Sequence, residues 1–193
     1  MAPKDQQYID DPERIRAVAH PLRLRLLDLL KDHGELTATE CAEATGESVA
    51  SCSFHLRMLE KYGFIERAEQ RGREKPWKLV GSGSYATGID ADVPGSLQAT
   101  VELARLTFAQ RSQGLWEAMQ RLDREPQEWL DATRLMNFAV WATAEEATEI
   151  GEAILALFER FEDRDDAGKR PEGARRLRVM TTIHSDPPPA EKA

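Results

Sequence analysis

The order of local signals between residues 12 and 80 constrains the fold of this chain more than any single motif does. Caps and glycine stops predict four short helices, the last two joined through a turn at Gly46 as in a helix-turn-helix. Apolar segments on either side of Gly72 predict a β-hairpin after them, and Pro76 favours an edge position for that hairpin. This order is typical of a winged helix. The predicted helices cover residues 12–19, 21–33, 38–45 and 49–62, and the strands cover residues 64–67 and 77–80.

Specific side chains mark where these helices begin. Asp11 stands before a proline, and proline suits the first turn of a helix. Thr37 and Glu40 have the spacing of a capping box, in which each side chain accepts a hydrogen bond from the other residue's backbone amide. Ser48 can cap the helix that follows the glycine turn. We therefore expect the second helix of the helix-turn-helix to begin at residue 49.

The chain divides at a segment rich in Gly, Ser and Asp. Residues 81–96 predict a linker between a first domain, residues 11–80, and a second domain, residues 97–186. Ser96 can cap a long helix that runs to about Asp123. Apolar residues on two sides of that helix favour packing on its own domain and on a second subunit, with a helix buried in a larger monomeric core as the alternative.

The second domain then shows a strand–helix–strand pattern. Apolar runs at 135–141 and 177–184 flank a helix at 144–161 that begins with a second capping box. This order predicts a β-α-β unit that leans on the long helix or on a partner chain, since two strands alone make a marginal sheet. The predicted fold class is α+β and mostly α, a winged helix-turn-helix followed by a long helix and this unit.

Composition excludes several classes of protein. The net charge of −8 argues against a polybasic nucleic-acid coat, and no apolar run is long enough to cross a bilayer. The N-terminus lacks the apolar core of a signal peptide. Cys41 and Cys52 are the only cysteines, too few for a disulfide framework. We expect a cytoplasmic globular protein that does not associate with a membrane.

The positive charge of this acidic chain is concentrated in one stretch. Residues 53–80 hold 7 Lys and Arg against 4 Asp and Glu. Such a concentration indicates a focused anion-binding face, and a solvated surface of mixed charge is the alternative.

The helix predicted over residues 49–62 has side chains suited to a DNA major groove opposite its apolar face. Small polar residues near its start can reach base edges or phosphates, and later basic residues can meet phosphates. The wing tip is short and cationic, which suits a neighbouring minor groove or phosphate run. The predicted DNA contacts are Arg23, Ser48, Val49, Ser51, Ser53, Phe54, His55, Arg57, Lys61, Arg71, Arg73 and Lys75.

Residues 12–80 resemble the winged helix of ArsR-type bacterial transcriptional regulators. The motifs AVAHPLRLRLLDLL, ELTATECAEATGES, SFHLRMLEKYGFIE and RGREKPW carry the resemblance in order, over a little more than a third of the chain. The resemblance implies a homodimer that binds operator DNA, since most members are repressors released by an effector. The residues that match the family's recognition helix are Gly46, Ser48, Ser53, His55 and Leu56.

Two residues depart from the family's recognition helix. Val49 stands in place of the usual glutamine and Phe54 in place of the usual arginine, both at groove-facing positions. These side chains can contact thymine methyl groups but cannot hydrogen-bond to a base edge, so an operator sequence does not carry over. His55 is interpreted as a packing or phosphate-contacting residue rather than a metal ligand.

The ligand sets of the family's metal sensors are missing. The stretch from Glu35 to Thr39 lacks the two cysteines of the metal-sensing motif, and the predicted long helices contain no histidine for a second family site. We therefore expect no metal site and no other cofactor. Cys41 and Cys52 are interpreted as small core residues, and a redox role for them is left open.

Large side chains in the second half favour either a core or a pocket for an apolar effector. The chain has no nucleophile elbow, no phosphate-cradling loop and no zinc-protease motif, so we do not expect an enzyme. The candidate effector-binding residues are Trp116, Trp129, Asn137, Phe138 and Trp141.

Together these patterns predict a homodimeric regulator that binds double-stranded operator DNA in a sequence-specific way. We expect a repressor that does not depend on a metal and is released by a small molecule. One alternative is a regulator controlled by a protein partner through its acidic C-terminal half. Another is a small-molecule-binding or enzymatic β-α-β module with a vestigial winged helix.

Overall fold

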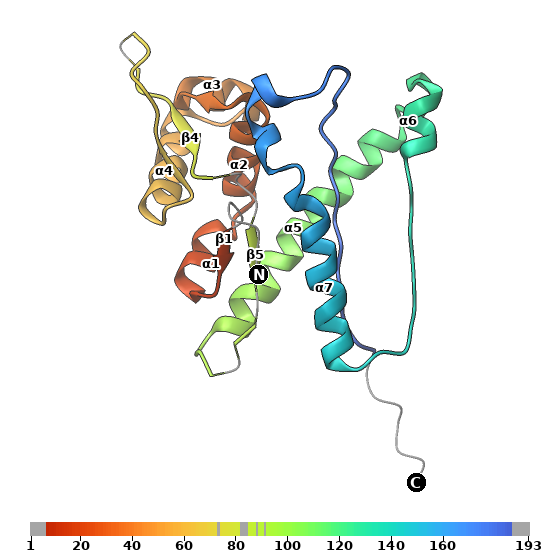
Figure 1. Cartoon of the computed structure of the whole chain (residues 1–193). Coiled ribbons are helices and arrows are strands. Elements are labelled where there is room, and N and C mark those ends of the chain that lie inside the picture. Colours follow the sequence, from red (N-terminus) through yellow and green to blue (C-terminus); the bar gives the residue numbers. More distant parts are fainter. Residues whose placement is uncertain (1–6, 73, 82–84, 88, 91, 187–193) are drawn as a thin grey trace. The chain divides into compact units, whose positions relative to one another are not determined.

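The computed structural model describes residues 7–72, 74–81, 85–87, 89–90 and 92–186 (Figure 1). By its internal contacts the chain divides into two units. The larger unit spans residues 4–130 and contains the predicted winged helix, and the smaller unit consists mainly of the residues from 131 onward.

Four helices of the larger unit begin at the residues that the sequence predicts. Asp11 accepts a hydrogen bond of 2.9 Å from the amide two residues further on and so caps the first helix. Thr37 and Glu40 form both hydrogen bonds of the predicted capping box, and Ser48 caps the fourth helix as expected. The helices are α1 (Pro12–Val18), α2 (Pro21–His33), α3 (Ala38–Thr45) and α4 (Val49–Lys61).

A three-stranded antiparallel sheet completes the winged helix. β4 (Trp77–Leu79) pairs with β3 (Ile65–Arg67) as the predicted hairpin and, along its other side, with β2 (Glu35–Leu36). β4 is therefore the central strand, and the edge position predicted from Pro76 is wrong. Pro76 lies one residue before the strand, where its missing N–H costs no ladder hydrogen bond. The two residues of β2 are too few to leave a strand pattern in the sequence.

A single apolar core is shared by the four helices, the three-stranded sheet and the start of the next helix. Leu26 and Leu30 of α2 and Leu56 and Leu59 of α4 are fully buried in it. Their spacing of three or four residues places them on one face of each helix. Burying a leucine side chain stabilises the fold by roughly 1.5–3 kcal/mol, so this core is the main source of stability in the unit.

A long helix, α5 (Ser96–Met119), packs by one face on α1 and α2, where Ala99 and Leu103 are buried. The predicted start of this helix is wrong by one residue. Gly95, with φ at +84°, is the capping residue. Ser96 lies inside the first turn, fully buried, and its hydroxyl accepts a hydrogen bond of 3.1 Å from the Asp90 amide. Burial of Ser96 in that contact explains why it does not cap the helix.

Polar contacts also fix α5 to α2. Arg111 donates two hydrogen bonds of 2.9 Å to the carboxylate of Asp28, and Gln110 donates a third at 2.7 Å. In the sequence, Arg111 interrupts an apolar seam. The structure shows the reason, since Arg111 reaches back to α2.

The segments on either side of the winged helix form a second, two-stranded sheet. β1 (Gln7–Ile9), from the N-terminal arm, pairs in parallel with β5 (Tyr85–Thr87), from the predicted linker. Ile9 is fully buried, and the Tyr85 hydroxyl lies 3.2 Å from the Thr107 hydroxyl of α5. This part of residues 81–96 therefore packs on the larger unit.

The described part of the smaller unit holds one long helix and much chain without regular structure. α7 (Ala144–Glu159) begins at the predicted capping box of Thr143 and Glu146. The strands predicted at 135–141 and 177–184 are not formed, so the predicted β-α-β unit is wrong. Its other short elements are the 3-10 turns Glu162–Asp165 and Ala167–Lys169, whereas the 3-10 turn Leu122–Arg124 and most of α6 (Gln127–Ala132) belong to the end of the larger unit.

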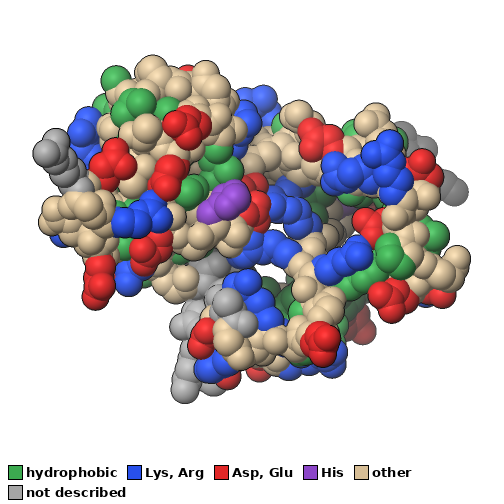
Figure 2. Space-filling model, turned by 90° about the horizontal axis from the view of Figure 1, so that it is seen from above, with side chains coloured by type: hydrophobic (Ala, Val, Ile, Leu, Met, Phe, Trp, Pro, Cys, Tyr) green, Lys and Arg blue, Asp and Glu red, His purple; other side chains and the backbone are tan. Residues whose placement is uncertain are grey.

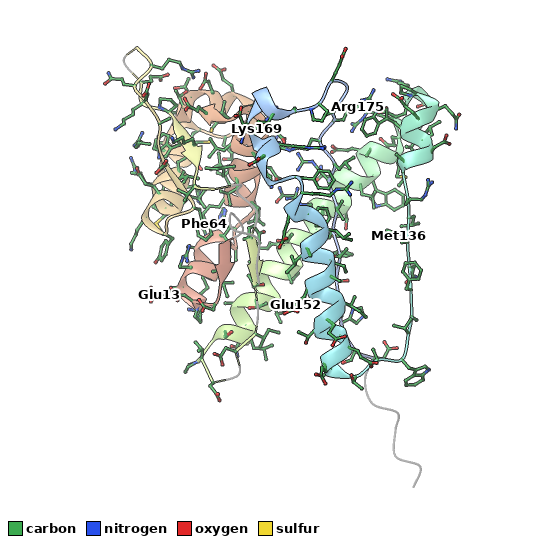
Figure 3. The ribbon with its side chains drawn as sticks, in the orientation of Figure 1. Glu13, Phe64, Met136, Glu152, Lys169 and Arg175 are labelled. Carbon is green, nitrogen blue, oxygen red and sulfur yellow. The ribbon has the colours of Figure 1, made fainter. Side chains whose placement is uncertain are left out.

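The physical reason for the missing strands is burial. The run at 135–141 is apolar enough for a buried strand, yet Phe138 is 82% and Trp141 100% exposed. Figure 3 shows Met136 projecting from the same extended segment. A strand needs a neighbour for its backbone hydrogen bonds and a core for its side chains, and nothing in the described part of this unit supplies either.

Candidate nucleic-acid interface

α4 turns one face to solvent, opposite its buried stripe. Phe54, Arg57 and Lys61 are exposed on this face, three and four residues apart, and Phe54 is 53% exposed. Val49, 46% exposed, is the first residue of the helix, five residues before Phe54. The exposed face therefore combines two cations with large apolar side chains.

The serines of α4 are more engaged than their pattern in the sequence indicates. The hydroxyl of Ser48 accepts a hydrogen bond of 3.1 Å from the Ser51 amide and so caps the helix. Ser51 and Ser53 are half-buried on opposite flanks of the helix. The small polar residues therefore border the exposed face, and its centre is formed by other side chains.

His55 lies on the flank of α4 that faces the start of α2. Its ring centroid is 4.4 Å from that of His20, and the Phe54 ring meets it edge-on at 5.2 Å. His20 Nδ1 accepts a hydrogen bond of 3.1 Å from the Leu22 amide and thereby caps α2. The histidine pair therefore connects the capped start of α2 to the exposed face of α4.

The surroundings favour the neutral form of both imidazoles. Burial, followed by the positive charge of Arg23, lowers the pKa of His20. Burial, followed by His20 and Arg23, lowers the pKa of His55 in the same way. The carboxylate of Glu47 opposes both shifts by a smaller amount. A second proton on either ring would therefore be unfavourable in this corner of the fold.

Arg23 connects this corner to α1. Its Nη2 donates a hydrogen bond of 3.0 Å to the Arg16 carbonyl, and its Nε is buried without a partner. An open hollow of about 190 Å³ lies beside it. The residues that line the hollow are Glu13, Arg16, Ala17, Arg23, Met58 and Tyr62.

Two polar contacts hold the wing tip against α3, and one of them is a hydrogen bond of 3.0 Å from the Thr39 hydroxyl to the Glu74 carboxylate. Arg71 donates hydrogen bonds of 2.7 and 2.8 Å to the two oxygens of Glu40. The amide of Thr37, and after it Arg71, lowers the pKa of this carboxyl. Glu40 thus serves both as the capping partner of α3 and as one anchor of the wing. Lys75 is exposed, and Arg73 lies outside the described residues.

Arg67 places the wing relative to α4, a role that the sequence analysis missed. Its guanidinium lies 3.4 Å from the centroid of the Trp77 ring and donates a hydrogen bond of 2.8 Å to the Lys75 carbonyl. It also pairs with Glu60 of α4, with 3.4 Å between Nε and Oε1. An arginine that faces an aromatic residue across a predicted hairpin is the sequence signal that could have identified it.

Seen from above (Figure 2), acidic and basic side chains are interspersed over the surface of the winged helix. Glu66, Glu69 and Glu74 are exposed among the cations of the hairpin. A polyanion would therefore meet repulsion over much of this surface. The exposed face of α4 is a narrower place where cations stand beside apolar side chains.

Comparison with known domains identifies this part of the chain. Residues 18–68 match a family model described as a helix-turn-helix domain, a range that runs from the end of α1 into the hairpin. The helices and the wing follow one another in the order that the ArsR-like motifs predict. The predicted winged helix-turn-helix is therefore confirmed. The chain carries a helix-turn-helix domain that is followed by a wing.

The chain is also similar to several solved structures. Reduced HlyU from Vibrio cholerae is 26% identical over 34% of this chain and 67% of its own, with a TM-score of 0.31. A possible transcriptional regulator for arsenical resistance is 25% identical over 65% of this chain and 99% of its own, with a TM-score of 0.32. The homodimeric winged helix of Mb0332 from Mycobacterium bovis is 22% identical over 60% of this chain and 84% of its own, with a TM-score of 0.34. No curated protein matches the chain.

The effector candidates are divided between the two units. Trp116, 68% exposed, and the half-buried Trp129 belong to the larger unit with the winged helix. Asn137, Phe138 and Trp141 are exposed on the extended segment of the smaller unit.

Both cysteines of the winged helix are fully buried. Burial, with smaller contributions from Cys52 and Glu40, raises the pKa of the Cys41 thiol to about 12. The hydroxyl of Thr45 lies 3.6 Å from Cys52 Sγ.

Among the residues that the structure describes, no group of three or more His, Cys, Asp or Glu side chains could hold a metal ion. None of the described helices is long and apolar enough to cross a membrane.

Proposed function

We propose that this protein is a transcriptional regulator that binds operator DNA in a sequence-specific way. The observation that carries the proposal is the exposed face of α4, where Arg57 and Lys61 share one side with Phe54 on the second helix of a helix-turn-helix. A helix with this composition suits a major groove, where its side chains meet base edges and its cations meet phosphates.

The contact set extends from α4 to both neighbouring elements. We propose that Arg23 contributes a phosphate contact beside the helix, and that Lys75 and Arg73 do so from the wing. Arg71 must exchange the carboxylate of Glu40 for a phosphate, so its net contribution is expected to be smaller. Ser48, Ser51, Ser53 and His55 complete the set, as hydroxyl or imidazole donors along the border of the exposed face.

We propose that α5 forms the interface of a homodimer. Its outward side carries a stripe of exposed apolar residues with the spacing of a coiled seam. A second copy placed against this stripe would pair two winged helices for two half-sites. The residues of the stripe are Leu97, Val101, Phe108 and Leu115.

The decisive experiment for DNA binding is selection of bound sequences from random duplexes by the purified full chain. One sequence family should be enriched, and its affinity should fall steeply with salt. Lys61→Ala should weaken binding to all sequences by a similar factor and reduce the salt slope by about 1. Lys169→Ala, an exposed cation of the smaller unit, is the matched control and should change neither. Failure to enrich any sequence would overturn the proposal.

The remaining parts of the proposal concern regulation. A Val101→Glu, Leu115→Glu double variant should sediment as a monomer and lose operator affinity. If this double variant remains a dimer, α5 does not form the interface.

We also propose that the protein represses transcription without a metal and that a small molecule releases it from DNA, and both points are tested on the purified protein. A metabolite that raises its melting temperature and lowers its operator affinity would be the effector.

A further inference from the structure

The first two turns of α4 expose apolar side chains where a DNA-reading helix commonly exposes hydrogen-bonding groups. Val49, Ala50 and Phe54 are exposed there, and we refer to them as the apolar patch. The hydroxyl oxygen of Ser48 accepts the hydrogen bond of the helix cap, so this side chain has only its proton to offer a base edge, and Ser51 is half-buried on a flank. The part of α4 that would enter a groove first is therefore apolar.

The largest member of the apolar patch is held in place. The Phe54 ring meets the His55 ring edge-on, with an interplanar angle of 83° and 5.2 Å between centroids. His55 in turn packs against His20 at the capped start of α2. A ring supported in this way loses little further freedom on binding, which favours its use as a contact residue.

The charges around the apolar patch indicate what it contacts. Arg57 and Lys61 continue the same face of α4, so the complementary surface is anionic with apolar groups projecting from it. In the major groove of DNA, the C5 methyl group of thymine is the apolar group that a base edge presents. Phosphates lie on either side of it, where the two cations can reach them.

We propose that the apolar patch binds thymine C5 methyl groups, and that Phe54 is the residue of α4 that determines specificity for them. This inference rests on the proposed function, because it needs α4 in the major groove. It adds the chemical identity of the recognised group. The same patch should accept 5-methylcytosine in place of cytosine, because both pyrimidines carry the methyl group on the same ring atom.

The test removes single methyl groups from the operator. With the full chain and the duplex selected from random sequences, each thymine is replaced in turn by deoxyuridine. One or two positions in each half-site should lose affinity by about fourfold per methyl, the value for one buried carbon group. Changing those positions to C·G should weaken binding, and methylating that cytosine at C5 should restore about the same factor.

Protein variants separate this contact from general binding. Phe54→Ala should bind the thymine and deoxyuridine duplexes equally, whereas Phe54→Leu should keep most of the difference. Lys61→Ala should weaken binding to both duplexes and leave their ratio unchanged. These three variants alter exposed side chains, so all should melt close to the wild-type temperature.

Two results would overturn the inference. One is an operator whose affinity is unchanged by every deoxyuridine substitution, and the other is a Phe54→Ala variant that retains the full ratio. Both would leave the proposed DNA-binding function intact. If no sequence is enriched from random duplexes, the proposed function itself fails and this inference fails with it.

Discussion

The two units of this chain contain similar local motifs but differ in what they bury. The larger unit has an apolar core in which Leu26, Leu56 and other side chains are fully buried. Among the side chains that the structure describes in residues 131–161, 163–164, 166 and 168–186 of the smaller unit, none is buried. The comparison shows that helix-forming sequence signals and a stable core are separate properties of a chain.

The capping boxes of the two units make this difference concrete. Thr37 and Glu40 form hydrogen bonds of 2.7 and 3.2 Å at the start of α3, and Thr143 and Glu146 form bonds of the same lengths at the start of α7. In both boxes the threonine amide lowers the pKa of the glutamate. Thr37 is nevertheless buried and Thr143 exposed. Caps depend on four neighbouring residues, whereas burial depends on the rest of the fold.

The apolar face of α7 shows what the smaller unit lacks. Ile150 and Leu157 are exposed, although their spacing is that of an inward-facing stripe. Ile183 of the extended C-terminal segment lies close to α7 at Gly151. Its Cδ1 would be 3.7 Å from a Cβ atom placed on that glycine, so it covers only a small part of the helix. A unit that buries so little apolar surface gains little from the hydrophobic effect.

The largest expected effect tests this comparison directly. Leu56→Ala should destabilise the protein by about 2–5 kcal/mol, because it leaves a cavity in the core of the larger unit. Leu157→Ala, at an exposed position of α7, should change the free energy of unfolding by less than about 0.5 kcal/mol. Urea denaturation of both variants measures the difference. Equal losses would show that α7 has a buried partner in solution.

A smaller effect should come from the polar contact that joins α5 to the winged helix. Arg111→Ala should cost about 1–3 kcal/mol, because the Asp28 carboxylate is largely shielded from water and would lose two of its hydrogen bonds. Arg105→Ala removes an exposed pair with Glu102 on the same helix and should leave the thermal midpoint unchanged. If both variants melt at the same temperature, the Asp28 contact does not contribute to stability.

The smallest effect concerns the neutral histidine that caps α2. Burial and Arg23 lower the pKa of His20 below its ordinary 6.5. Below that pH the unfolded chain therefore binds a proton at His20 more readily than the folded protein does. The contribution of the neutral His20 to the free energy of unfolding should be fully present above pH 6.5 and should be lost as the pH falls. His20→Asn keeps a capping side chain without this proton.

The measurement for His20 is unfolding of both proteins in urea between pH 7.5 and pH 5. Relative to His20→Asn, the wild type should lose about 1 kcal/mol over this range, the value of one helix cap. Parallel pH profiles for the two proteins would show that the His20 cap does not titrate. This outcome would remove the acid sensitivity predicted for the larger unit.

Much of the winged helix was predictable because its signals are local. Asp11, Thr37 and Ser48 cap helices where the sequence predicts, and the hairpin forms around Gly72. The predicted strand at 135–141 failed because apolar composition alone cannot supply a pairing neighbour. β2 and the Arg111 contact were missed because each depends on a partner more than 40 residues away.

The candidate interface divides in the same way. The sequence identified Phe54, Arg57 and Lys61 as an outward face, since helical spacing determines which residues share a side. It did not predict that Glu40 would hold Arg71, that Arg67 would stack on Trp77, or that His20 would meet His55. Each of these contacts joins different elements, so only packing decides it.

The sequence by itself determined the helices of the winged helix, their caps, and the face that each presents, because these follow from short-range hydrogen bonds and from helical periodicity. The tertiary structure decided which apolar faces are covered, which cations are already paired, and which histidines remain neutral. Coverage, pairing and neutrality depend on distance and solvent access between groups far apart in the chain, and those quantities exist only once the elements have packed.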